Sequence, residues 1–156
     1  MNIRQMIVIG LWSSATSLLP KGMREKHSVR AKWRLCKKAN SCFVHVPKVA
    51  GTAISRVIYG RKLGHYPAAT IRRWVGEKEF ESIPSFSVLR DPYERVASAF
   101  RYLQGGGTRT GGVHPRSFFW ARKYPTLEDF VLKGLVGEDL FGRDYSVWPQ
   151  TAFICG

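Results

Sequence analysis

Two short apolar runs, each joined by a turn to a helical segment, constrain the fold of this chain more than any other feature. Residues 41–46 (SCFVHV) and 85–89 (SFSVL) are rich in β-branched and aromatic residues, a composition typical of buried strands. Proline ends the first run and precedes the second, and residues 52–59 and 93–103 then follow helical patterns. Strands that alternate with helices predict an α/β domain with a largely parallel sheet.

Two further helices and a loop complete the predicted domain. Residues 67–75 read as a helix that has proline in its first turn. Thr126 with Asp129 three residues on is a variant of the capping box, and it predicts the start of another helix. Five glycines between residues 105 and 112 predict a flexible loop. The helix after Thr126 has an apolar face made of Leu127, Phe130, Val131 and Leu135.

The net charge of the chain limits the class of its partners. Lys and Arg number 25 against 11 Asp and Glu among 156 residues, which gives a formal net charge of +14. A field of this sign favours polyanions such as nucleic acid, sulfated glycans, anionic lipid or a phosphate-rich cofactor. The sequence has no recognised nucleic-acid motif, so we do not expect a specific nucleic acid. With 44% apolar residues, a folded core is expected.

The chain divides near residue 40 into a leader and a domain. Residues 6–19 are mostly apolar, but they are fewer than the about 20 residues of a spanning helix and lack a signal-peptide cleavage site. Basic residues follow this stretch, the reverse of what an anchor with a lumenal domain prefers. We therefore favour a poorly ordered leader and basic linker over residues 1–40, while membrane association stays open. The folded domain is expected over residues 41–156.

The three cysteines, Cys36, Cys42 and Cys155, are odd in number and include no C-x-x-C pair. Such a set argues against a disulfide framework and against a zinc site. We therefore expect buried or partly exposed free thiols and no metal.

The segment PKVAGT at residues 47–52 has the chemistry of an anion site. A helix N-terminus offers open N–H groups and the positive end of the helix dipole. Gly51 lets the backbone approach an anion, Lys48 adds positive charge and Thr52 adds a hydroxyl donor. The lysine precedes the glycine, the reverse of the Walker A order, which disfavours a nucleotide kinase. The alternative is a plain β-turn-α junction with a surface lysine.

A second anion-binding candidate lies at residues 90–98. Arg90 follows the second predicted strand, at the edge where open α/β sheets bind ligands. Ser98 lies about two turns into the next helix. Arg90 could bind a phosphate in bidentate fashion, with a hydroxyl from Ser98. The alternative is an ion pair of Arg90 with Asp91 and a packing role for Ser98.

Together these segments resemble sulfotransferases that use 3'-phosphoadenosine 5'-phosphosulfate (PAPS), in the branch of the Golgi carbohydrate enzymes and their bacterial relatives. Residues 46–52 (VPKVAGT) resemble the family's 5'-phosphosulfate loop, and residues 89–98 (LRDPYERVAS) its 3'-phosphate segment. Smaller resemblances lie at residues 124–130 (YPTLEDF) and 147–153 (VWPQTAF). The resemblance covers residues 41–154 and implies a P-loop-like parallel sheet flanked by helices. It also implies that this fold is incomplete at the C-terminus, because the relatives continue further.

The resemblance also implies an enzyme that transfers a sulfuryl group from PAPS to an acceptor hydroxyl, on a carbohydrate, without a metal. The compartment would be cytoplasmic or membrane-associated for a bacterial relative and the Golgi lumen for a eukaryotic one. Lys48 would contact the bridging oxygen and the 5'-phosphate, and Arg90 and Ser98 would hold the 3'-phosphate. The backbone cradle of the 5'-phosphate would comprise Gly51, Thr52, Ala53 and Ile54.

His65 is the first candidate for the base that accepts the hydroxyl proton, because histidine titrates near neutral pH and the family often has one in a similar place. A surface or capping role is the alternative. Glu77, Glu79 and His114 are weaker candidates, and His45, directly before the loop, is interpreted as structural. The alternative function is a non-catalytic, truncated or degenerate module that binds polyanions through its basic residues.

Overall fold

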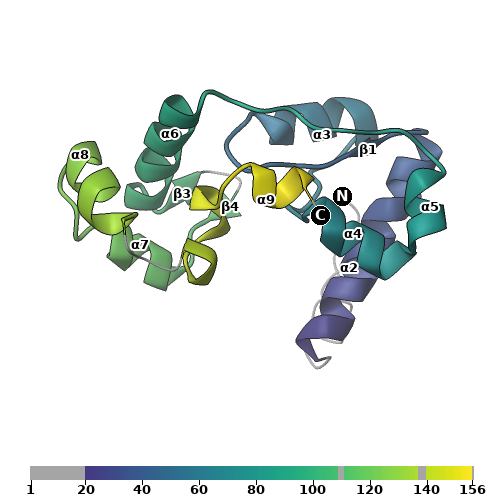
Figure 1. Cartoon of the computed structure of the whole chain (residues 1–156), viewed down its shortest axis with the longest axis horizontal. Coiled ribbons are helices and arrows are strands. Elements are labelled where there is room, and N and C mark those ends of the chain that lie inside the picture. Colours follow the sequence, from purple (N-terminus) through teal and green to yellow (C-terminus); the bar gives the residue numbers. More distant parts are fainter. Residues whose placement is uncertain (1–19, 109–110, 137–139, 156) are drawn as a thin grey trace, which may run out of the picture.

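The computed structural model describes residues 20–108, 111–136 and 140–155, and within them the chain is mostly helical (Figure 1). The first half contains α2 (Lys21–Lys38), β1 (Cys42–Phe43), α3 (Gly51–Tyr59), α4 (Ala68–Val75), α5 (Glu77–Glu81) and β2 (Ser85–Phe86). The second half contains α6 (Pro92–Gln104), β3 (Gly107–Thr108), β4 (Gly111–Gly112), α7 (Pro115–Ala121), α8 (Leu127–Asp129) and α9 (Thr151–Ile154). A π-helical turn (Phe130–Gly134) and two 3₁₀ turns (Leu140–Gly142 and Tyr145–Val147) lie between α8 and α9.

The α/β class is confirmed in its coarse form by a small parallel sheet. β1 and β2 pair in parallel with Cys42 opposite Ser85, and the helices α3, α4 and α5 connect them. Both strands are shorter than predicted. The backbone leaves the sheet after β1 because Val46 N donates to the Val44 carbonyl oxygen over 3.1 Å, a three-residue turn. After β2, the Ser87 hydroxyl occupies that same carbonyl oxygen over 2.8 Å.

Residues 85–89 were predicted to form a buried strand, and the predicted burial is wrong. Phe86 is 39% exposed and Leu89 is 54% exposed. Among the described residues β2 pairs with β1 alone, so its other edge has no strand beside it. The apolar pattern of the segment indicated a strand. Whether a strand is buried depends on the elements that pack over it, and the residues of the strand itself do not specify them.

The prediction of a poorly ordered basic linker is wrong for residues 21–38, which form α2. Its residues Val29, Trp33 and Cys36 are buried and join a core cluster with β1, α4 and α5. The apolar residues recur at helical spacing, so one face packs on the domain while most basic side chains lie on the other faces. No described helix has the length and apolar character to cross a membrane, and the predicted leader over residues 1–19 lies outside the described residues.

A second core cluster joins α6, α7 and the π-helical turn around Phe100, Trp120 and Phe130. The predicted cap is confirmed, since Thr126 Oγ1 accepts a hydrogen bond from Asp129 N over 3.0 Å. The apolar face after this cap is only partly buried, because Phe130 is enclosed while Val131 is 37% exposed. The predicted glycine-rich loop contains the short hairpin of β3 and β4, and residues 109–110 lie outside the described residues.

Candidate anion-binding site

The loop between β1 and α3 holds two residues in the left-handed region of backbone space. Lys48 has a φ of 70° and Ala50 a φ of 62°, although neither is glycine. Such conformations cost about 1–3 kcal/mol each and persist only where the surrounding structure imposes them. The loop therefore turns sharply, and α3 begins directly after it at Gly51.

The first turn of α3 has open backbone donors. No side chain among the described residues caps this helix, and Ala50 stands at the N-cap position. The Ala53 N–H bonds back to the Ala50 carbonyl over 2.9 Å, but an α-helix leaves its earliest N–H groups without intrahelical partners. These donors and the positive end of the helix dipole favour an anion at this position.

Gly51 lies against the ring of His45. A Cβ on Gly51 would stand 2.1 Å from both Cδ2 and Nε2 of that ring. His45 is buried, and its Nδ1 lies 3.3 Å from the Leu63 carbonyl oxygen. The ring thus fills the space against the first turn of α3, which is the kind of structural role that we expected for His45.

Gly51→Ala is expected to destabilise the fold by about 1–3 kcal/mol and to weaken anion binding, because overpacking displaces either the His45 ring or the loop. The matched control is Gly22→Ala on α2, where an added Cβ meets nothing within 4 Å. Gly22 is the second residue of α2 and alanine is the better helix former, so the control should lose no stability. Thermal unfolding measures both. Equal Tm values for the two variants would contradict the close packing of Gly51 on His45.

A cavity of about 400 Å³ opens at the N-terminus of α3, within the size range of small-molecule sites. It brings together most of the predicted loop residues, which are Lys48, Gly51, Thr52 and Ala53, with His65. Ile54 is not part of its lining, and the Ile54 N–H lies 3.4 Å from the Ala50 carbonyl oxygen. Sequence reasoning gave no site role to several other lining residues, which are Lys62, Tyr102, Tyr145 and Ser146.

The electrostatics of this cavity favour an anion. Lys48 Nζ lies 4.2 Å from the centroid of the Tyr102 ring, a cation–π contact that orients the lysine. Burial, and then the positive charges of Arg90 and Arg101, lower the pKa of Lys48. A bound phosphate or sulfate would relieve the repulsion among these cations.

Arg90 and Ser98 do not line the cavity, although the charge of Arg90 acts on Lys48. The guanidinium of Arg90 donates from Nε and Nη2 to Glu94 Oε2 over 3.1 and 3.0 Å. The alternative ion pair with Asp91 is not formed, because Asp91 caps α6 by accepting from Glu94 N over 3.0 Å. Ser98 is half-buried on α6. An exposed pair such as Arg90–Glu94 contributes at most about 1 kcal/mol, so a phosphate could displace the glutamate.

Arg95 connects the loop to the C-terminal segment, a role that sequence reasoning missed. It is 4% exposed. Its Nε donates to the Pro47 carbonyl over 3.1 Å, and its Nη2 donates to the carbonyls of Ser146 and Trp148 over 3.1 and 2.8 Å. Burial lowers its pKa. The available signal was its place inside the segment at residues 89–98, where only Arg90 and Ser98 received a role.

His65 lies on the wall of the cavity as a neutral imidazole. Its ring centroid is 3.9 Å from that of His45 and 5.1 Å from that of Tyr145. Burial lowers its pKa to about 4, so the imidazole is neutral at pH 7. Its Nδ1 lies 3.2 Å from the His45 carbonyl oxygen, which can only accept, so Nδ1 carries the proton. Nε2 is therefore the nitrogen left with a lone pair.

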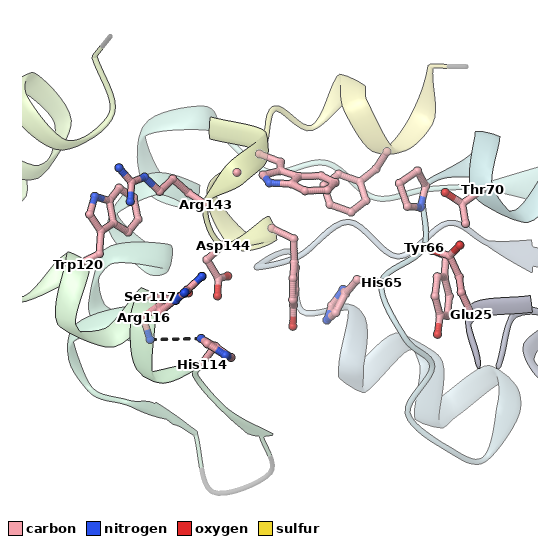
Figure 2. Close-up of a pocket in the computed structure, with 15 residues that line it drawn as sticks. Glu25, His65, Tyr66, Thr70, His114, Arg116, Ser117, Trp120, Arg143 and Asp144 are labelled. Atoms are coloured by element: carbon pink, nitrogen blue, oxygen red, sulfur yellow. Dashed lines mark hydrogen bonds between the residues drawn. The ribbon is translucent and has the colours of Figure 1, made fainter. Parts of the chain in front are cut away.

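A second, larger cavity of about 560 Å³ shares His65 and Tyr145 with the first. In Figure 2, His65 lies between Tyr66 on one side and His114 with Arg116 on the other. The cavity also has aromatic walls from Trp120 and Trp148. His65 thus separates the anion-binding cavity from an adjoining space that combines aromatic surfaces with polar groups.

The weaker candidates for a base have other partners. Glu77 pairs with Arg72 Nε over 3.0 Å, and Glu79 accepts from Trp33 Nε1 and Lys37 Nζ, each over 2.9 Å. His114 lines the larger cavity, but its Nδ1 accepts from Arg116 N over 3.2 Å as the N-cap of α7. In the described part of the chain, no three His, Cys, Asp or Glu side chains gather where they could hold a metal ion.

Comparisons with protein-family models, curated proteins and solved structures found no match for this chain. The chemistry of the site therefore rests on its own side chains. They provide a cationic cradle at a helix N-terminus, a neutral imidazole beside it and an adjoining aromatic cavity.

Proposed function

We propose that this protein is a sulfotransferase that moves a sulfuryl group from PAPS to a hydroxyl group of a carbohydrate. The observation that carries the proposal is the single cavity in which Lys48, the N-terminus of α3 and His65 meet. Sulfuryl transfer asks a protein to align donor and acceptor and to neutralise charge on the leaving group. A cation, open N–H donors and a neutral imidazole supply these requirements.

Each group has one task in the proposed reaction. The first N–H groups of α3 hold the 5'-phosphate, and Lys48 neutralises the charge that develops on its bridging oxygen. His65 Nε2 accepts the proton of the acceptor hydroxyl. PAPS, when bound, supplies the sulfuryl group and leaves as 3'-phosphoadenosine 5'-phosphate. The chain's own side chains thus bind, orient and accept one proton.

The larger cavity offers a place for the acceptor on the other side of His65. Tyr66, Tyr145, Trp120 and Trp148 give it flat apolar surfaces, and Thr70 and Ser117 add hydroxyl groups. A pocket with aromatic walls and a few polar groups suits a ring that carries hydroxyls. This arrangement supports a carbohydrate acceptor.

The 3'-phosphate would be held by Arg90 and Ser98 of α6 and its preceding turn. This requires Arg90 to exchange Glu94 for the phosphate, to which a guanidinium binds in bidentate fashion. Gln150 fixes the backbone of Arg90, since Gln150 Oε1 accepts from Arg90 N and Gln150 Nε2 donates to Arg90 O, over 3.0 and 2.8 Å. The P-loop-like fold belongs to the same proposal, supported by the order of β1, loop and α3 and by the parallel β2.

Calorimetric titration with 3'-phosphoadenosine 5'-phosphate tests the proposal, with AMP as the ligand that lacks the 3'-phosphate. The wild type should bind the former more tightly. Arg90→Ala should remove that preference, and Lys48→Ala should weaken both ligands, each by about tenfold or more, because charge-assisted hydrogen bonds to phosphate contribute about 1.5–3 kcal/mol. Arg34→Ala, on the exposed face of α2, is the matched loss of one positive charge and should leave both affinities unchanged. A folded wild type that binds neither ligand would refute the proposal.

A second candidate function, a non-catalytic module that binds polyanions, is favoured by the basic surface of α2. Its affinity would fall steeply with salt and would not distinguish the two nucleotides. In the same titrations, losses of similar size for Arg34→Ala and Arg90→Ala would select this candidate over the enzyme. The surface concerned is formed by exposed Lys21, Arg24, Arg30, Arg34, Lys37 and Lys38.

A further inference from the structure

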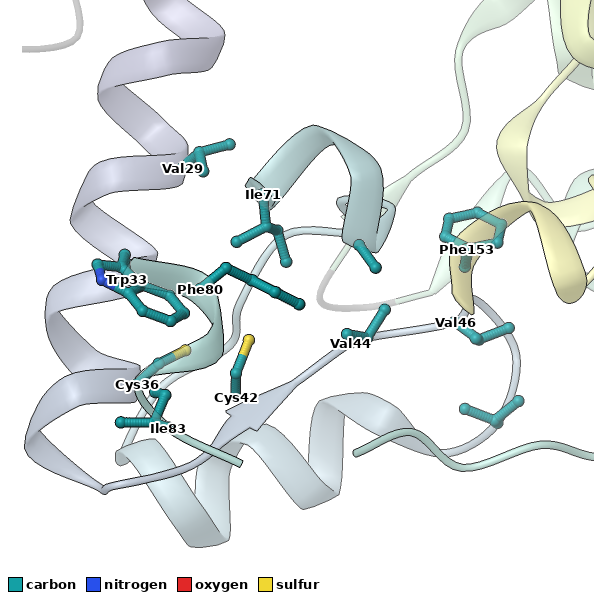
Figure 3. Packing of buried hydrophobic residues seen from close by; sticks show 12 residues of the cluster. Val29, Trp33, Cys36, Cys42, Val44, Val46, Ile71, Phe80, Ile83 and Phe153 are labelled. Carbon is teal, nitrogen blue, oxygen red and sulfur yellow. The ribbon is translucent and has the colours of Figure 1, made fainter. Parts of the chain in front are cut away.

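Two buried thiols lie together between α2 and β1, outside both cavities. Cys36 lies near the end of α2 and Cys42 opens β1, and both side chains are fully buried as free thiols. The turn between the two elements is tight, because Ser41 N donates to the Cys36 carbonyl over 3.1 Å. Figure 3 shows both sulfur atoms in the space between the helix and the strand. The fold therefore holds two cysteines next to each other without joining them.

The two thiols differ in reactivity. The neighbouring Cys42 thiol, and then the charge of Lys32, lower the pKa of Cys36 to about 7. The neighbouring Cys36 thiol and burial raise the pKa of Cys42. The thiolate is the reactive form of cysteine, so Cys36 is the nucleophile of the pair and Cys42 is its neighbour with a retained proton.

Lys32 completes the cluster one helical turn before Cys36. It is 4% exposed, and among the described residues its Nζ has no hydrogen-bond partner. A buried ammonium without an acceptor is costly, and a Cys36 thiolate supplies the missing negative charge. Lys32 also lines a small cavity of about 120 Å³ between α2 and residues 61–66.

We propose that Cys36 and Cys42 are a redox modification site that closes to a disulfide between α2 and β1 when the protein meets a peroxide. The Cys36 thiolate attacks one peroxide oxygen, the O–O bond breaks, and a sulfenic acid and water form. The Cys42 sulfur then attacks the sulfenic sulfur, an S–S bond forms and a second water leaves. Two thiols lose two electrons and two protons in total, and one hydrogen peroxide becomes two waters.

The cross-link would tie α2 to the strand that leads into the anion-binding loop. Tyr59, the last residue of α3, already bonds this strand, since its hydroxyl accepts from Phe43 N over 2.8 Å and donates to the Ser41 carbonyl over 3.0 Å. A disulfide at Cys42 would add a covalent tie to the same strand. Because it constrains the unfolded chain, oxidation should raise the Tm by about 5 °C.

The test oxidises the folded full-length chain with stoichiometric hydrogen peroxide, blocks remaining thiols and maps tryptic peptides without reduction. The Cys155→Ser background removes the exposed third cysteine and serves as the control. We expect the peptides of residues 35–37 and 39–48 to be joined, with a mass two hydrogens below the sum of the two reduced peptides. The oxidised chain should remain a monomer, and dithiothreitol should separate the two peptides again. In Cys42→Ser, a dimedone adduct should trap the sulfenic acid on Cys36.

Two results would overturn the proposal, and both are read on the wild-type chain. In the first, Cys36 and Cys42 stay reduced in the folded chain, although the same chain forms the disulfide once it is unfolded in guanidinium. The other is oxidation of Cys36 to sulfinic acid without a cross-link, or a cross-link to Cys155. The readout involves no nucleotide, so it stands or fails independently of the sulfotransferase proposal.

Discussion

Replacing Arg95 by alanine is expected to lower the free energy of unfolding by about 3–5 kcal/mol, because three carbonyl oxygens in or beside the core lose their donor. These carbonyls belong to Pro47, Ser146 and Trp148. For a chain of this size each kcal/mol lowers the Tm by about 2–4 °C, so the midpoint should fall by about 6–20 °C. Affinity for 3'-phosphoadenosine 5'-phosphate should fall as well, since the loop that carries Lys48 loses an attachment.

The matched control for this prediction is Arg101→Ala, an exposed arginine on the same helix, whose loss should change stability by less than about 0.5 kcal/mol. Arg95→Lys keeps the charge but cannot donate in a planar fork, so it should recover part of the loss only. Differential scanning calorimetry distinguishes the variants. If Arg95→Ala melts together with Arg101→Ala, the three hydrogen bonds do not hold the loop to the C-terminal segment.

Acidification below pH 6.5 is expected to destabilise the protein steeply, owing to two neutral histidines, the buried His45 and the half-buried His65. Burial lowers the pKa of His45 to about 3 and that of His65 to about 4, whereas an unfolded histidine titrates near pH 6.5. Between these values the unfolded chain binds protons that the folded chain does not bind. Stability is therefore complete above about pH 6.5 and is lost as the pH falls toward 4, with a slope of up to about 2.7 kcal/mol per pH unit for two protons.

Denaturant unfolding at a series of pH values between 4 and 7 measures this slope. His65→Gln should remove about half of it, because one of the two protons is no longer taken up. His27→Gln replaces an exposed histidine of α2 and is the matched control, because it removes no ring from the interior. A pH profile unchanged in His65→Gln would show that His65 does not fold into the structure as a neutral, half-buried ring.

Features set by neighbouring residues were predictable from the sequence. The cap of Thr126 on Asp129 involves atoms three residues apart, and the start of α3 at Gly51 follows from a proline and a glycine within five residues. The grouping of Lys48, Gly51 and Thr52 was also within reach, because a loop at the start of a helix exposes its donors, whereas His65 was named from a resemblance. These signals are local, so the chain's own pattern carries them.

Features set by distant partners were not predictable. Arg95 bonds carbonyls that lie 48 to 53 residues away, and no local pattern announces them. The burial of Val29 and Trp33 depends on α4 and α5, so the surrounding positive charge suggested a solvated arm instead. The exposure of Phe86 depends on the lack of a strand beside β2 among the described residues. In each case the deciding contact joins segments that only the folded chain brings together.

The left-handed backbone of Lys48 and Ala50 means that the entropy of arranging the loop is lost during folding, before any anion arrives. Anion binding then does not have to order the backbone of the loop. Free energy gained from hydrogen bonds and charge appears almost entirely as affinity, and none of it is diverted to ordering the backbone. Recognition of an anion by a loop of this kind is closer to lock-and-key than to induced fit.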